Sequence, residues 1–205
     1  MPVSFPRTWA SAPYEGAIRR AIVAYKDEGR RDAADVLAPL LREAVVGAVG
    51  ATVRTVEHGL WVVAVPTSSK ARARRGDAPL EVLARRATFG VEGLVQAPWA
   101  LAVRRGVADQ AGLDHRARAA NLSRAMRADP ASAGRTVVLV DDVVTTGATL
   151  AEAARALRDV GCSDVVAACV AATRRRTTDH RDRIDRARED GTEGMGHGVW
   201  PPARA

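Results

Sequence analysis

Two adjacent aspartates, Asp141 and Asp142, directly follow a short apolar run and are the side chains in this sequence best placed to do chemistry. The run TVVLV at residues 136–140 predicts a buried strand that ends at the aspartates, and a helix is expected to start near residue 148. Between strand and helix lie small or hydroxyl-bearing residues: Thr145, Thr146, Gly147, Ala148 and Thr149. The amides and positive dipole end of such a helix favour an anion. A sugar phosphate fits both halves, because its hydroxyls can donate to the acids while the loop holds its phosphate.

Two other interpretations are compatible with this segment. A pair of solvated acids could simply precede a threonine turn that caps the helix. A response-regulator receiver also carries paired acids after a strand, but those acids lie near the start of the domain. Here only a short stretch of foldable chain follows them, so the sugar-phosphate interpretation is favoured.

The elements that position these residues can be predicted from periodicity. Apolar residues at spacings of three and four predict two amphipathic helices between residues 14 and 45. Apolar runs predict buried strands at residues 60–66, 99–103 and 164–172, and helices are expected at 78–87, at 114–128 and from 148 to a stop at Gly161. Strands separated by helices indicate a parallel sheet covered on both faces. The predicted fold class is therefore α/β.

The segment VVLVDDVVTTGATL at residues 137–150 resembles the phosphoribosyl pyrophosphate (PRPP) binding motif of type I phosphoribosyltransferases. More narrowly, residues 14–173 are similar to the ComF-type competence-protein branch of that superfamily. The shared segments are YEG at 14–16, AYKDEGR at 24–30, AVP at 64–66, RARRG at 72–76 and the frame of Gln110, Leu113, Arg116 and Asn121. ComF proteins commonly begin with a cysteine-rich zinc module, and this chain has no cysteine before Cys162. We therefore expect the module to be absent.

The resemblance implies a type I phosphoribosyltransferase-like fold, with a mainly parallel central sheet, flanking helices and a small helical hood. It divides the chain into an extended arm (1–13), the hood (14–58), the phosphoribosyltransferase core (59–173) and a basic, partly disordered tail (174–205).

The resemblance also assigns roles to individual residues. Asp141 and Asp142 would bind the ribose hydroxyls, and through them or through water a magnesium ion, while the loop at residues 145–149 would bind the 5-phosphate. The pyrophosphate site would consist of Thr67, Ser68, Ser69, Lys70 and Arg75. A mobile loop would close over the reaction, with Arg104, Arg105 and Gln110 as its catalytic residues.

The amino-acid composition excludes several classes of protein. The chain of 205 residues is 47% hydrophobic and 27% charged, which excludes collagen, coiled coils and wholly disordered chains. Of its 31 basic residues only Lys26 and Lys70 are lysines, and the net charge of +7 favours partners that carry phosphate or carboxylate. Genome composition is an equally good explanation of an arginine bias in so alanine-rich a chain. The spacing of Cys162 and Cys169 cannot build a zinc site. No apolar run suits a signal peptide or a membrane span, so a cytoplasmic protein without membrane contact is expected.

Three functions follow from these observations. The first is a magnesium-dependent phosphoribosyltransferase, a pentosyltransferase acting on PRPP and an unknown acceptor. The second is a PRPP or nucleotide sensor that has lost turnover. The third is a nucleic-acid-handling accessory protein, in keeping with the link between ComF proteins and DNA uptake; aromatic residues, the usual stacking platforms for single strands, make up only 4% of the chain. A homodimer and a nucleic-acid partner stay open at this point.

Overall fold

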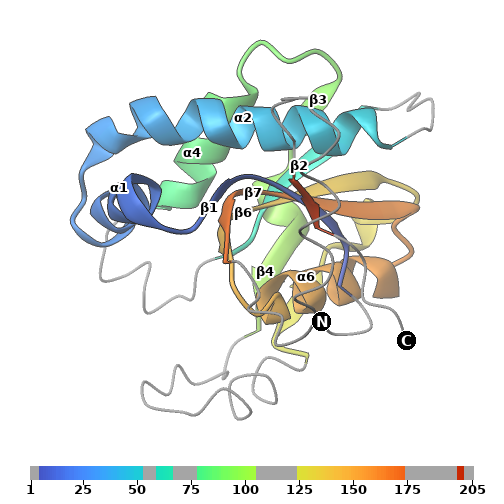
Figure 1. Cartoon of the computed structure of the whole chain (residues 1–205). Coiled ribbons are helices and arrows are strands. Elements are labelled where there is room, and N and C mark those ends of the chain that lie inside the picture. Colours follow the sequence, from blue (N-terminus) through green and yellow to red (C-terminus); the bar gives the residue numbers. More distant parts are fainter. Residues whose placement is uncertain (1–4, 53–58, 67–77, 105–123, 174–197, 201–205) are drawn as a thin grey trace, which may run out of the picture.

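A mainly parallel sheet runs through the centre of the molecule (Figure 1). The computed structural model describes residues 5–52, 59–66, 78–104, 124–173 and 198–200. Within them the sheet has six strands in the order β3-β2-β6-β7-β1-β8. These are β1 (Arg7–Pro13), β2 (Leu60–Ala64), β3 (Leu94–Gln96), β6 (Thr136–Val144), β7 (Asp164–Ala172) and β8 (Gly198–Trp200). All neighbours are parallel except β8, which is antiparallel to β1. The predicted α/β fold class is confirmed.

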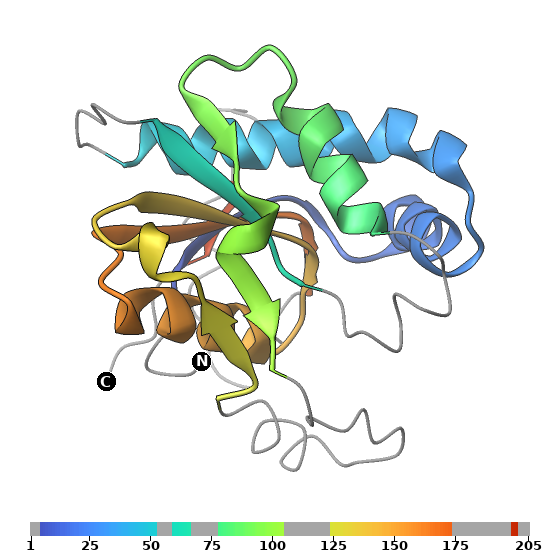
Figure 2. The ribbon, with the colours of Figure 1, turned by 180° about the vertical axis from the view of Figure 1, so that it is seen from behind.

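Helices cover both faces of the sheet (Figures 1 and 2). The helices α2 (Ala34–Gly50) and α4 (Pro79–Thr88) lie on one face, and α6 (Ala148–Asp159) lies on the other. The helix α1 (Gly16–Asp27) follows β1 at the edge where the parallel strands end. Short 3-10 turns complete the described connections: η1 (Arg31–Ala33), η2 (Pro98–Ala100) and η3 (Pro130–Ser132).

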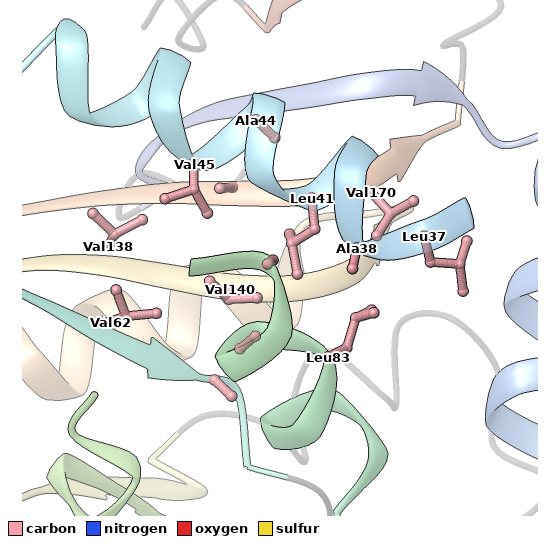
Figure 3. Close-up of a cluster of buried hydrophobic side chains, with 14 of the residues drawn as sticks. Leu37, Ala38, Leu41, Ala44, Val45, Val62, Leu83, Val138, Val140 and Val170 are labelled. Atoms are coloured by element: carbon pink, nitrogen blue, oxygen red, sulfur yellow. The ribbon is translucent and has the colours of Figure 1, made fainter. Parts of the chain in front are cut away.

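Alternating residues of the central strands pack into two separate apolar cores, one on each face of the sheet. Val138 and Val140 of β6 pack towards α2 and α4, whereas Val137 and Leu139 pack towards α6. Figure 3 shows the first core, in which Leu41 of α2 lies above the strands. Because both faces of β6 are covered, its first five residues are all buried, as expected for a central parallel strand.

The segment expected to be an extended arm is partly built into the sheet. Residues 7–13 form β1, which pairs in parallel with β7 from Arg7 opposite Val166 to Pro13 opposite Ala172. Trp9 of β1 is buried beneath α2, where a Cβ on Gly47 would lie 3.1 Å from the indole ring. Likewise α2, from the predicted hood region, packs directly on the sheet.

The expected helix at residues 114–128 is wrong at its carboxyl end. Residues 114–123 lie outside the described part of the chain, and β5 (Met126–Ala128) is a strand, antiparallel to β4 (Leu101–Val103). Tertiary contacts explain the difference, since the buried Glu152 of α6 accepts a hydrogen bond from the Met126 amide at 3.0 Å. The strand expected at 99–103 begins only at Leu101, because residues 98–100 form the 3-10 turn η2.

The helix stop at Gly161 is confirmed. Gly161 has a φ of +89°, its amide donates to the Arg158 carbonyl, and the Cys162 amide donates to the Leu157 carbonyl. These two bonds form a Schellman motif, which favours glycine in the left-handed region. The chain is thereby turned from α6 into β7, the strand that supports the acidic pair.

Candidate functional site

The acidic pair lies within strand β6 rather than after it. The sequence predicted a strand that ends at Val140, but β6 continues to Val144. Pairing with β2 stops at Ala64 opposite Val140, while β7 continues beside β6 and places Cys169 opposite Asp141 and Ala172 opposite Val144. The longer neighbour supplies hydrogen-bond partners beyond the end of β2. The two carboxylates are therefore fixed on a strand that projects past one of its neighbours.

The loop after β6 turns directly into α6. Thr145 and Thr146 are exposed, Gly147 is buried with a φ of +78°, and α6 begins at Ala148 as the sequence predicted. The Thr146 hydroxyl accepts a hydrogen bond from the Ala148 amide at 3.3 Å. The first amides of a helix have no partner within it, so this end of α6 offers donors and a positive dipole end. The left-handed position explains why glycine is required at the helix cap.

The two carboxylates are held by different contacts. Asp142 Oδ2 lies 2.7 Å from Lys26 Nζ of α1, and Asp142 Oδ1 accepts the Val143 amide at 2.8 Å. Asp141 Oδ1 accepts the Asp142 amide at 2.9 Å. Each aspartate is thus oriented by a backbone bond that fixes its side chain, and Asp142 has a cation beside it as well.

Electrostatics set Asp141 apart from an ordinary surface carboxylate. Burial, reinforced by the neighbouring charge of Asp142 and opposed by Lys26, raises the pKa of Asp141 to about 8. Burial also raises the pKa of the Cys169 thiol opposite Asp141, and the two acids add to that effect. The thiol is therefore neutral and not a nucleophile. A site that raises the proton affinity of Asp141 favours positive charge or hydroxyl donors next to it.

A cavity of about 440 Å³ opens beside the acidic pair. On one side it is lined by Asp141, Asp142, Thr145 and Thr149. The other side is formed by α1, by the start of α4 and by Val65 and Pro66 after β2. The predicted ribose-binding acids and two residues of the predicted phosphate loop thus line a single cavity, and Thr146, Gly147 and Ala148 lie in the connecting turn.

Lys26 belongs to the site although no sequence motif predicted it there. Its partner Asp142 is distant in the sequence, so no local pattern links them. Two signals were available: Lys26 is one of two lysines in an arginine-rich chain, and it lies in the AYKDEGR segment. Among the described residues that line the cavity, Lys26 carries the one positive charge.

The remaining predicted residues are only partly placed. Arg104 is exposed at the end of β4, where its amide donates to the Ala125 carbonyl at 2.8 Å, and it does not line the cavity. The other residues predicted for the pyrophosphate site and the mobile loop lie outside the described residues: Thr67, Ser68, Ser69, Lys70, Arg75, Arg105 and Gln110. Pro66, the last described residue before Thr67, lines the cavity.

Two further findings concern metals and membranes. In the described ranges, no group of three or more His, Cys, Asp or Glu side chains could hold a metal ion. The helices of those ranges are also too short or too polar to cross a bilayer.

The fold and the cavity can be compared with known proteins. The family model described as the phosphoribosyl transferase domain matches residues 14–202. The chain belongs to this family. The match includes the acidic pair, the loop at residues 145–149 and the helices that line the cavity, and it confirms the predicted membership of the phosphoribosyltransferase superfamily.

Similarity to individual curated proteins is local. Over 36 residues the chain is 67% identical to a ribose-phosphate pyrophosphokinase of Methanopyrus kandleri, a match that covers 18% of this chain and 12% of that protein. Over 69 residues it is 44% identical to the DNA utilization protein YhgH of Escherichia coli, covering 34% of this chain and 30% of that one. The chain thus spans less than a third of the length of these relatives. Among solved structures, the glutamine PRPP amidotransferase from B. subtilis matches 79% of this chain and 31% of its own, with a TM-score of 0.40 and 18% identity.

Proposed function

We propose that this protein binds PRPP with magnesium and transfers the ribosyl phosphate to an acceptor, with release of pyrophosphate. The observation that carries the proposal is the single cavity that Asp141 and Asp142 share with Thr145 and Thr149. An anion alone would be repelled by the acids, and a neutral sugar would not need the amides of α6. A phosphorylated sugar uses both.

In this proposal each half of the site binds one part of the substrate. The carboxylates of Asp141 and Asp142 accept hydrogen bonds from the ribose hydroxyls. The amides at the start of α6 and the hydroxyls of Thr145 and Thr149 donate to the 5-phosphate. Family membership supports this division, because the matched region contains all of these residues.

The acids also stabilise the transition state in this proposal. As the bond between C1 and the pyrophosphate oxygen breaks, its electron pair leaves with pyrophosphate and positive charge grows on the ribose ring. The Asp142 carboxylate, and the Asp141 carboxylate once its proton has left, stabilise the growing charge beside that ring, and both are already oriented by the Asp142 and Val143 amides.

The acidic pair fits magnesium. Mg²⁺ prefers oxygen ligands, keeps several waters and is commonly held by one or two carboxylates together with substrate phosphates. Asp141 and Asp142 would hold it through water or through the ribose hydroxyls. When bound, the ion neutralises charge on the leaving pyrophosphate.

Arg104, at the end of β4, and residues outside the described ranges complete the proposed site. Following the family resemblance, residues 67–70 and Arg75 would bind pyrophosphate. Arg104, Arg105 and Gln110 would close over the reaction and exclude water, which otherwise competes as the acceptor.

Ligand-dependent stabilisation tests the proposal. PRPP with magnesium should raise the melting temperature of the wild-type protein, since a ligand that binds only the folded state stabilises it. The double variant Asp141→Asn, Asp142→Asn should fold but show no shift, whereas Asp164→Asn, at the opposite end of the sheet, should keep the full shift. A double variant that still binds PRPP with unchanged affinity would contradict the site assignment. Release of pyrophosphate across a panel of acceptors then separates an enzyme from a sensor.

A second candidate function is the handling of nucleic acid in DNA uptake or use. It is favoured by the partial similarity to the DNA utilization protein YhgH and by the net charge of +7. If it operates through phosphate contacts, affinity for DNA must fall steeply as salt rises. DNA affinity that does not change with salt concentration, or no DNA binding at low salt, would exclude this second function.

A further inference from the structure

One charged side chain is buried in the part of the chain that the structure describes, and the proposed mechanism does not use it. Glu152 of α6 is 6% exposed, whereas the other buried positions of that helix are alanine or leucine. A carboxylate taken out of water is costly unless partners compensate for it. Even a well-paired buried ion pair adds little net stability over apolar residues of the same shape, so stability alone does not explain this one.

Glu152 and Arg155 together hold both backbone polar groups of Met126 in β5. Oε1 of Glu152 accepts the Met126 amide at 3.0 Å, and Nη2 of Arg155 donates to the Met126 carbonyl at 3.2 Å. Arg155 also donates to both carboxylate oxygens of Glu152, at 2.7 Å and 2.8 Å. Burial raises the pKa of Glu152, but the bonds from Arg155 and from the Met126 backbone outweigh it and lower the pKa, so the carboxylate stays ionised.

The backbone contacts continue from Met126 to Arg104. β5 pairs with β4 so that Met126 lies opposite Val103, and the Arg104 amide donates to the Ala125 carbonyl at 2.8 Å. Both strands lie beside α6 in the two opposite views (Figures 1 and 2). Because Met126 is bonded to α6, the backbone at Arg104 is fixed relative to this helix.

The same helix carries the phosphate-binding end of the proposed site. α6 begins at Ala148, and Thr149, which lines the cavity, lies three residues before Glu152. Leu150 and Ala153 pack this part of the helix against the sheet. The start of α6 and its contact with β5 are therefore held at a constant separation, within one packed turn of helix.

Building on the function proposed above, we infer that Glu152 and Arg155 are positioning residues, which hold Arg104 through β5 and β4 where its guanidinium meets the pyrophosphate of PRPP. The acids and the start of α6 take up the ribose and the 5-phosphate, which leaves pyrophosphate as the remaining charged part. Arg104 does not line the described cavity, so the ligand group within its reach is one that extends beyond it. A guanidinium matches phosphate oxygens, and a fixed backbone reduces the freedom that it loses on binding.

A pair of ligands separates this role from a merely structural one. Ribose 5-phosphate contains the groups bound by the acids and by α6 but lacks pyrophosphate. With the full chain and magnesium, Glu152→Gln should weaken PRPP binding about tenfold and change ribose 5-phosphate affinity by less than about twofold. Asp159→Asn is the matched control, because this exposed acid of α6 binds Arg155 through Nη1, the nitrogen not used for Glu152 or Met126. It should change neither affinity.

A double-mutant cycle shows whether the effect passes through Arg104. Arg104→Ala should itself weaken PRPP binding about tenfold. Combining it with Glu152→Gln should cause no further loss, because two residues that act as one unit are not additive. If Glu152→Gln does not fold, Arg155→Lys replaces it: lysine keeps the charge beside Glu152 but lacks the fork that also reaches the Met126 carbonyl, and the same difference between the two ligands is expected.

The outcomes separate this inference from the proposed function. If the wild-type protein binds PRPP but the variant leaves PRPP affinity unchanged, weakens both ligands equally, or adds its full loss to that of Arg104→Ala, the inference is overturned and the proposed function stands. If the wild-type protein does not bind PRPP at all, both fall.

Discussion

The substitution Asp141→Asn should make the protein more stable and unable to bind its ligand. Asp141 shares a partly buried site with Asp142, and burial together with that second charge raises its pKa from 3.8 to about 8. The folded protein therefore holds a proton on Asp141 that the unfolded chain releases near pH 4. The stability that this proton confers is fully present below pH 4 and is lost as the pH rises through about 8. Above pH 8, ionised Asp141 destabilises the fold, and asparagine removes that cost.

The size of the stability gain from Asp141→Asn follows from the shift in the pKa of Asp141. Each pKa unit corresponds to about 1.4 kcal/mol, so the shift of the Asp141 pKa limits the gain in the free energy of unfolding to roughly 6 kcal/mol. Asp141 is only partly buried, and the nearby positive charge of Lys26 lowers its pKa, so both factors reduce the cost of ionising it. We expect a gain of about 1–3 kcal/mol at pH 9, which in a chain of this size raises the melting temperature by about 2–4 °C for each kcal/mol. At pH 4 the wild-type carboxyl is already neutral, so the gain should be close to zero.

The assay is urea denaturation at pH 4 and pH 9 without divalent cations, followed by thermal shift with PRPP and magnesium. Asp35→Asn, an exposed aspartate on α2, is the control and should show neither the gain in stability at pH 9 nor the loss of the PRPP shift. A variant that gains nothing at pH 9, or gains equally at both pH values, would refute the electrostatic reasoning.

Three other substitutions test separate parts of the site. Lys26→Met should weaken PRPP binding about tenfold because it removes the cation beside Asp142, whereas Lys26→Arg should keep most of the affinity. Equal PRPP affinities in a titration of the two variants would show that the positive charge at residue 26 does not contribute to binding. Gly147→Ala should cost about 1 kcal/mol of stability, since φ at this helix cap is +78°, and should weaken binding of ribose 5-phosphate in the same titration; unchanged stability in urea would show that the turn tolerates a side chain. Glu152→Ala should lower stability by about 2–4 kcal/mol, because the buried carboxylate holds Arg155 and the Met126 amide, and a loss below 1 kcal/mol would mean that this contact does not anchor β5.

The acidic pair and its loop were predictable because their signals are local. A β-rich run, two aspartates and a Thr-Thr-Gly turn stand within one short segment, and the helix start at Ala148 and the stop at Gly161 depend on neighbouring residues. The strand at residues 60–66 and the helix at 78–87 were likewise identified from runs and periodicity, with small shifts at their ends.

Features that depend on distant residues were not predictable. The acids continue β6 because β7 extends alongside them, and Met126 joins a strand because β4 and Glu152 supply its partners. Lys26 reaches the site only once α1 is folded over the end of the sheet. In each case the deciding contact joins segments far apart in the sequence, where local periodicity carries no information.

The central claim is that one cavity holds the sugar through two acids and its phosphate through the adjoining turn. The most direct measurement is a crystal structure of the protein with PRPP and magnesium. We predict ribose hydroxyls within hydrogen-bonding distance of Asp141 and Asp142, and the 5-phosphate against the amides of residues 145–149. A ribose phosphate bound elsewhere, with Lys26 still paired to Asp142 and the cavity free of ligand, would contradict it.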